Sequence, residues 1–408
     1  MKKNPVLSVL AGILFFTVAG IYAQDVNRLS PLEKALTPVK FSGEIGSYGE
    51  IHKYQHDVND SYKWLTAYID LKFEMAPIAD LGLSLGGEFL GHNEVYDSDE
   101  DRYDVDIEHS AKESLAQLYL KYEFEKMLMA QFGRIDTMWN GKKMTHLDDN
   151  RYQGLIANYA LRDDMRISAG YITAFAELDY DDAEEFYYVD NNNNKDAGQG
   201  VALAEYAWTP NFGMLGLTIN PYVYDQTDYA NVMGANLQAK LAISDGFKVG
   251  SILDLQRINS RVNGVKDADN YHIAFTGELG LGGPNKLSAQ IGHANLDGDD
   301  GEVYMVKPNW FEDYMIPIDQ TQIPYNQNAS SYYGKVKFAT EMMGHACWAS
   351  VVYLDTRYNV NSFARDWEFQ VGYSFTRKSA INLRLFHIEY DNSAMNANRL
   401  EMKVNYKF

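Results

Sequence analysis

One stretch of the chain gathers charged side chains of both signs around a tryptophan and a histidine. It reads FGRIDTMWNGKKMTHLDDNRYQG and covers residues 132–154. Where opposed charges face each other across a narrow passage of low dielectric constant, their field orients polar solutes and filters ions. The sequence therefore predicts a constriction, with a solvated external loop as the alternative interpretation. Its predicted residues are Arg134, Asp136, Lys142, Lys143, Asp148, Asp149 and Arg151.

Little in the sequence points to catalysis. A hydrolase needs a nucleophile with a base within reach. The Gly-x-Ser-x-Gly match at residues 82–86 lies inside an alternating strand-like segment, and His387 has no recognisable partner spacing. The nine histidines are scattered without a His-Glu-x-x-His pattern. We therefore predict that the chain is not an enzyme and has no cofactor.

Carboxylates cluster in three runs, at residues 97–108, 178–185 and 297–302. Such clusters suit a hard cation with oxygen ligands, yet none of them has the EF-hand spacing. Structural calcium in these acidic runs is left open, and solvated acidic loops are the better interpretation. No metal site is predicted.

The segments around these residues alternate between apolar and polar side chains at every second position. In WLTAYIDLKFEM, residues 64–75, Leu65 and Ile69 belong to one face, whereas Asp70 and Glu74 belong to the other. This period indicates a β-strand with one apolar face. The segment is also about as long as a tilted strand that crosses a bilayer.

Short and long connections alternate along the chain, a pattern typical of outer-membrane barrels. The short ones lie at residues 76–80, 125–127, 162–164, 211–213, 244–246, 282–285, 341–344 and 376–379. The long ones lie near 52–63, 91–113, 135–151, 176–199, 225–231, 257–270, 294–330, 355–366 and 391–398. The sequence therefore predicts an all-β fold. It is a transmembrane antiparallel β-barrel of about 18 strands over residues 39–408, with short periplasmic turns and long extracellular loops.

The chain ends in RLEMKVNYKF, where apolar and polar residues alternate up to Phe408. This pattern predicts a last strand that closes the barrel against the first one. A C-terminal aromatic residue resembles the signal by which outer-membrane assembly machinery recognises its clients. Phe408 is therefore the predicted assembly signal.

The N-terminus reads as an export signal. Lys2 and Lys3 precede an apolar stretch, and Ile21-Tyr22-Ala23 resembles a cleavage site. We predict a signal peptide over residues 1–23, with a retained anchor helix as the alternative. A capping box at residues 30–33 predicts a short periplasmic helix within residues 24–38.

Composition narrows the function further. The formal net charge of −20 over 408 residues argues against nucleic acid as a partner. The mean hydropathy of −0.36 is too low for a bundle of membrane-spanning helices. Cys347 is the only cysteine, so no disulfide framework or cysteine-based metal site is expected.

Charged residues on the polar faces of the strands are expected to line the lumen. The predicted basic residues are Lys121, Arg166, Lys240, Lys248, Lys335 and Lys337. The predicted acidic residues are Asp70, Glu74, Glu123, Asp254, Glu278 and Glu368. A line of basic groups would pass anions or carboxylates, whereas the acidic outer loops would concentrate cations at the mouth. Because strand residues alone do not settle selectivity, the loops favour a modest cation preference.

The stretch from Glu113 to Glu177 resembles the OprD-type specific porins and the related major-outer-membrane-protein porins. The matching features are Gly133-Arg134, Asp148-Asp149-x-Arg151 and Ala169-Gly170-Tyr171. The resemblance implies an eighteen-stranded porin, often trimeric, in which loops three and seven shape the constriction. The chain lacks the proline that follows the Asp-Asp-x-Arg motif, and the resemblance transfers no substrate-pocket residues.

Together these features predict an outer-membrane porin of a Gram-negative-type cell. Small hydrophilic solutes and ions would diffuse through it, past a constriction formed by the third long loop. Its predicted partners are outer-membrane lipid and the assembly machinery, and assembly into homotrimers is left open. The alternative is a surface structural or adhesive barrel without an open pore. The charges of both signs in the third loop favour the pore.

Overall fold

A computed structural model describes most of the predicted barrel. The described residues are 39–54, 62–78, 81–97, 112–125, 127–135, 138–139, 142–143, 151–176, 187–188, 200–226, 230–261, 267–296, 329–358, 362–391 and 396–408. The predicted signal peptide at residues 1–23 and the predicted helix at residues 24–38 lie outside this part. Within it, no helix is long and apolar enough to cross a membrane.

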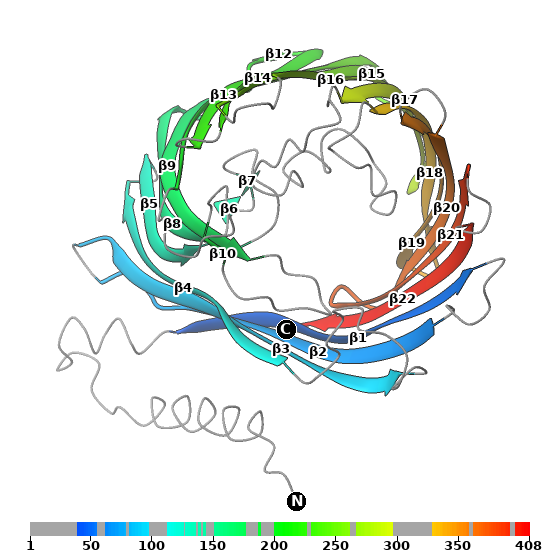
Figure 1. Cartoon of the computed structure of the whole chain (residues 1–408), viewed down its shortest axis with the longest axis horizontal. Coiled ribbons are helices and arrows are strands. Elements are labelled where there is room, and N and C mark those ends of the chain that lie inside the picture. Colours follow the sequence, from blue (N-terminus) through cyan, green and yellow to red (C-terminus); the bar gives the residue numbers. More distant parts are fainter. Residues whose placement is uncertain are drawn as a thin grey trace, which may run out of the picture.

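Eighteen long strands of the described chain form one closed antiparallel ring (Figure 1). They are β1 (Lys40–Tyr54), β2 (Tyr62–Glu74), β3 (Leu83–Asp97), β4 (Lys112–Phe124), β5 (Leu128–Ile135), β8 (Arg151–Arg162), β9 (Met165–Ala176), β11 (Val201–Trp208), β13 (Leu215–Gln226), β14 (Ala230–Ser244), β15 (Phe247–Ser260), β16 (Ala268–Gly282), β17 (Asn285–Leu296), β18 (Ala329–Met342), β19 (His345–Tyr358), β20 (Ser362–Ser374), β21 (Ser379–Tyr390) and β22 (Ala397–Lys407). Each of these strands pairs with the next, and β22 pairs with β1 to close the ring.

Four strands of two residues each complete the described elements. β6 (Met138–Trp139) and β7 (Lys142–Lys143) pair only with each other. β10 (Tyr187–Tyr188) pairs with β9, and β12 (Asn211–Phe212) pairs with β13. These short strands leave the closed ring unchanged.

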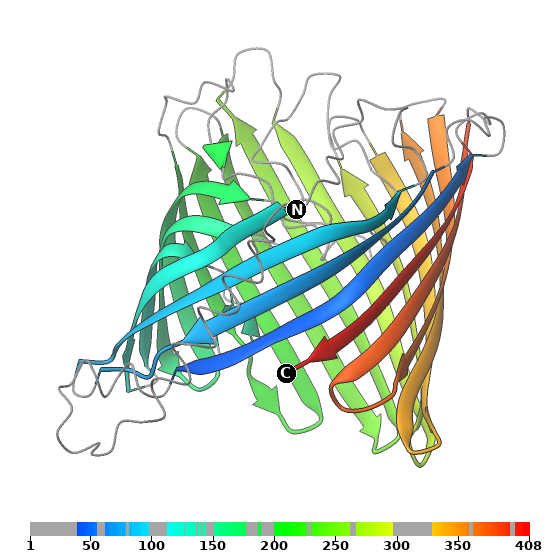
Figure 2. The same cartoon turned by 90° about the horizontal axis from the view of Figure 1, so that it is seen from below.

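The strand boundaries confirm the predicted alternation of connections. Each predicted short turn separates two consecutive long strands, from β2 and β3 to β20 and β21, and each predicted long loop falls at the opposite end of a strand. Figure 2 shows the strands inclined to the barrel axis, with short hairpin turns at one end. The predicted all-β transmembrane barrel of about 18 strands is therefore confirmed.

The two faces of the strands differ as a membrane barrel requires. Large apolar side chains, such as Phe132 and Ile291, are exposed on the outer face. Charged side chains, such as Glu88, Asp366 and Glu368, are buried on the inner face. Because a soluble protein shows the reverse arrangement, the outer face suits lipid and the inner face suits a wet lumen.

The chain closes as its last residues predict. On β22, Leu400, Met402 and Val404 lie opposite Ile51, Gly49 and Ser47 of β1. The Phe408 amide donates a hydrogen bond to the Gly43 carbonyl oxygen at 3.1 Å. The prediction that the last strand closes the barrel against the first is confirmed.

Candidate functional site

The segment with opposed charges lies partly outside the described residues. Of the acidic runs considered for calcium, only Asp97 at the end of β3 lies within them. The constriction residues outside them are Asp136, Asp148 and Asp149. Lys142 and Lys143 form β7, and Arg151 opens β8. In the view along the barrel axis, β6 and β7 fall inside the ring of strands (Figure 1). The constriction itself stays a prediction.

Arg134 lies on a different face from the one predicted. Strand β5 continues to Ile135, so the alternation of the strand decides where Arg134 points. Its register partners are Leu118 and Gln153, and Leu118 belongs to the exposed apolar face. The Arg134 guanidinium donates a hydrogen bond to the Leu115 carbonyl oxygen at 3.0 Å. This outward position does not support a place for Arg134 in the constriction.

The six basic residues predicted for the lumen occupy register positions on the inner face. Lys121 forms an ion pair with Glu74 and lies 3.6 Å from Glu123. Arg166 is two residues from Ser168, which is buried and donates a hydrogen bond to Asn158 at 2.6 Å. The other four, Lys240, Lys248, Lys335 and Lys337, lie on strands β14 to β18.

These four lysines and Lys286 form one surface of the lumen, called the lysine wall below. Lys248 lies opposite Glu278, and Lys335 and Lys337 lie opposite Gln290 and Ser288. A groove of about 530 Å³ runs along this wall. Its polar lining residues include Thr218, Gln238, Lys240, Thr276, Glu278 and Gln290.

The lysine wall has more cations than carboxylates. Glu278 is its only carboxylate in the groove lining, and it pairs with Lys240 at 2.7 Å and Lys286 at 2.8 Å. Within the described chain, Lys335 and Lys337 have no ion-pair partner, and Lys337 Nζ lies 4.4 Å from the Trp348 ring centroid. Since Lys335 and Lys337 are two residues apart on one strand face, their Cα atoms are separated by about 7 Å. Such a pair can bind an anionic group between them.

A second group of charged residues lies in the lumen wall at the place where the ring closes, and there each arginine pairs with two carboxylates. Arg384 of β21 lies 2.8 Å from Glu368 and 3.2 Å from Glu401. Arg399 of β22 lies 3.0 Å from Glu401 and 2.5 Å from Glu50 of β1. These five residues, called the seam network below, link β20, β21, β22 and β1.

Sequence reasoning found only Glu368 of the seam network. The alternation of β21 and β22 places Arg384, Arg399 and Glu401 on the polar face, so that signal was available. Their pairing was not, because it depends on the register between strands.

Beside the lysine wall, a buried chain of hydrogen bonds connects side chains of β15, β16, β17 and β18 on the inner face of the barrel. Gln290 donates to the Tyr333 hydroxyl at 2.7 Å, and that hydroxyl lies 2.8 Å from His272 Nε2. His272 Nδ1 lies 2.9 Å from an Asp254 carboxylate oxygen. An aspartate, a histidine and a hydroxyl in sequence resemble a hydrolase relay, but this hydroxyl also accepts a bond and is buried. The arrangement therefore fixes Tyr333 in place rather than exposing a nucleophile.

Comparisons with solved structures identify the fold. The structure of OpdQ from Pseudomonas aeruginosa matches with a TM-score of 0.68 and 14% identity, over 91% of this chain and 98% of that chain. OccAB4 from Acinetobacter baumannii matches with a TM-score of 0.66 and 14% identity, over 91% and 98%. OpdK from P. aeruginosa, solved with vanillate, matches with a TM-score of 0.63 and 12% identity, over 90% and 98%.

No family model matches the sequence, and no curated protein does. At these identities the likeness shows the fold alone. The chain has the fold of the OprD-type porins, as the sequence motifs predicted. Together with the apolar outer face, this fold is that of a multi-pass barrel of the outer-membrane type.

Proposed function

From this fold, we propose that the chain is an outer-membrane channel for passive diffusion of small hydrophilic solutes and ions. The lysine wall carries the proposal further, because it favours solutes with a carboxylate group. Selection would come from pore width and fixed charge, with no energised step. The third long loop would narrow the lumen through Lys142, Lys143, Arg151 and the acidic residues around them.

The excess of cations on the lysine wall supports a preference for carboxylates. A fixed positive charge in a narrow lumen lowers the energy of an anion there and raises that of a cation. Vanillate, a carboxylate, is the ligand in one solved structure of the same fold, that of OpdK. The acidic outer loops favour cations at the mouth, so the two effects oppose each other along the pore.

A planar-bilayer recording tests the proposal. The refolded protein is expected to give discrete conductance steps and, in a salt gradient, a reversal potential on the anion side. Addition of vanillate is expected to interrupt the current more than addition of an uncharged analogue of the same size. A folded barrel without steps would support the adhesive alternative, and a cation-side reversal would assign selectivity to the acidic loops.

Export and assembly of the channel involve three further proposals. Phe408 would serve as the recognition signal for the outer-membrane assembly machinery, and its partly exposed side chain at the end of the closing strand supports that role. Removal of residues 1–23 on export and assembly into homotrimers are proposed on sequence grounds only. Pulse-chase export assays of Phe408→Ala and of the wild type would test the assembly role.

A further inference from the structure

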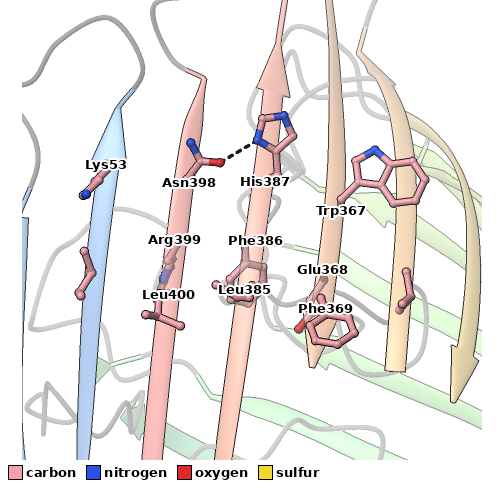
Figure 3. Close-up of a pocket in the computed structure, with 12 residues that line it drawn as sticks. Lys53, Trp367, Glu368, Phe369, Leu385, Phe386, His387, Asn398, Arg399 and Leu400 are labelled. Carbon is pink, nitrogen blue, oxygen red and sulfur yellow. Dashed lines mark hydrogen bonds between the residues drawn. The ribbon is translucent and has the colours of Figure 1, made fainter. Parts of the chain in front are cut away.

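A second groove lies on the outer face of the barrel, away from the lumen. It has a volume of about 510 Å³ and spans β19, β20, β21, β22 and β1 (Figure 3). One row of cross-strand neighbours in it is apolar: Val351, Phe369, Leu385, Leu400 and Ile51. Phe369 and Leu385 are over 40% exposed, so this row offers a surface for acyl chains.

The neighbouring row, towards the long-loop end of the barrel, is polar and aromatic. It consists of Tyr353, Trp367, His387, Asn398 and Lys53, each opposite the next across a strand pair. His387 Nδ1 lies 2.8 Å from Asn398 Oδ1, and the rings of Tyr353 and Trp367 are 4.4 Å apart. Figure 3 shows Lys53, Asn398, His387 and Trp367 side by side on neighbouring strands.

The charges around these rows favour an anionic ligand. Lys53 is exposed and forms no ion pair with a described residue, and exposed Lys63 lies opposite Ile51. As diagonal neighbours, the two lysines have Cα atoms about 7–8 Å apart. Nearby, Asp355 lies 3.4 Å from Arg365 and 3.9 Å from Arg357, and Glu389 lies 3.4 Å from His387. Among the described residues around these rows, both carboxylates are therefore paired, while Lys53 keeps its charge for a ligand.

We propose that this groove binds a phosphorylated, acylated glycolipid of the outer leaflet. The acyl chains lie on the apolar row, and a phosphate lies between Lys53 and Lys63. The sugar hydroxyls lie against His387 and Asn398, with a sugar face on Trp367. A glycolipid uses all three features of the groove, whereas a plain phospholipid has no sugar to contact His387, Asn398 and the Trp367 ring.

An outward arginine on the other side of the barrel shows what distinguishes the groove. Arg257 of β15 also lies near the long-loop end, but Asp267 and Asp269 each lie 3.6 Å from its guanidinium. It also donates a hydrogen bond to Asn259 at 3.0 Å. Its charge is therefore compensated within the chain, and Arg257→Gln provides a matched control.

Native mass spectrometry of the refolded full chain tests the site. The probes are bisphosphorylated lipid A, its dephosphorylated form, and phosphatidylglycerol. The wild type is expected to retain one bisphosphorylated lipid A. The double variant Lys53→Gln with Lys63→Gln is expected to retain it about tenfold less well, because each surface lysine contributes to binding of anionic lipid. Arg257→Gln is expected to behave as the wild type.

Several outcomes would overturn the proposal. These are unchanged retention by the double variant, an equal loss in Arg257→Gln, or equal retention of phosphatidylglycerol. A wild-type oligomer that the double variant dissociates would make the groove a contact between copies of the chain. If the double variant does not fold, the retention of the different lipids by the wild type tests the proposal. Equal retention of dephosphorylated and bisphosphorylated lipid A would then refute a phosphate site.

Discussion

The lysine wall and the seam network carry the same kinds of charge in different proportions. In the seam network, Arg384 and Arg399 each contact two carboxylates, and the Glu50, Glu368 and Glu401 side chains are at most 2% exposed. On the lysine wall, Lys240 and Lys286 share Glu278 and are 53% and 52% exposed. In the seam network three carboxylates surround two arginines, whereas the lysine wall keeps positive charge facing the lumen.

This difference in pairing separates structural charges from functional ones. A buried ion pair is costly to break, because the remaining partner is left without compensation. An exposed cation without a partner adds little to stability but contributes to the field in the lumen. The seam network should therefore hold β22 against β1, while the lysine wall should select solutes.

The largest expected effect comes from breaking the seam. Glu401→Gln removes one carboxylate from both Arg384 and Arg399, which leaves these guanidinium groups with Glu368 and Glu50 alone. We expect a loss of about 3 kcal/mol in unfolding free energy. Urea titration followed by the electrophoretic shift between folded and unfolded barrel measures it. Anion selectivity should change little, and a stability equal to the wild type would show that the seam pairs are not structural.

A charge reversal on the lysine wall should change ion selectivity and leave the unfolding free energy nearly unchanged. The double variant Lys335→Glu with Lys337→Glu is expected to move the reversal potential in a salt gradient to the cation side, at nearly unchanged stability. Arg377→Glu with Lys378→Glu makes the same change in net charge on the exposed turn between β20 and β21. A reversal potential that moves equally in both variants would assign selectivity to net charge rather than to the wall.

The fold was predictable because a membrane barrel has two regular sequence features, the alternation within its strands and the recurrence of short turns between them. The alternation at every second residue places an apolar side chain towards lipid, and the turns recur at one end with few residues. Segments such as residues 64–75 and 400–408 therefore indicated strands and their faces. Arg134 shows where this reasoning fails. Strand β5 ends one residue after Arg134, so the direction of the Arg134 side chain is set by the strand and not by the loop.

The candidate site was predictable in its parts but not in its pairings. Lys240 and Lys337 lie on the polar faces of strands far apart in the sequence, and only the strand register shows that they border one groove. The same register decides that Glu278 is shared by Lys240 and Lys286, while Glu401 is shared by two arginines. A single strand contains no information about the stagger of its neighbours. The outer groove needed the same knowledge of register, because its rows cross five strands.

The smallest expected effect on stability comes from an exposed ion pair, which serves as a reference for the buried seam network. In the turn between β8 and β9, Arg162 donates two hydrogen bonds to the Asp164 carboxylate, at 2.9 and 2.8 Å, and Trp208 donates a third at 3.1 Å. The Arg162 bonds are the main reason why the pKa of Asp164 lies below its ordinary value of 3.8.

A lowered pKa in the folded chain means that this carboxylate stabilises the fold above its ordinary pKa. The contribution is lost as the pH falls through the lowered value. Asp164→Asn should therefore reduce the unfolding temperature slightly at pH 7, and wild type and variant should converge in acid. Because the pair is exposed, the loss should be far smaller than in Glu401→Gln. Parallel melts of both variants at pH 7 and in acid measure it. If Asp164→Asn were as destabilising as Glu401→Gln, burial would not be what distinguishes the seam from the lysine wall.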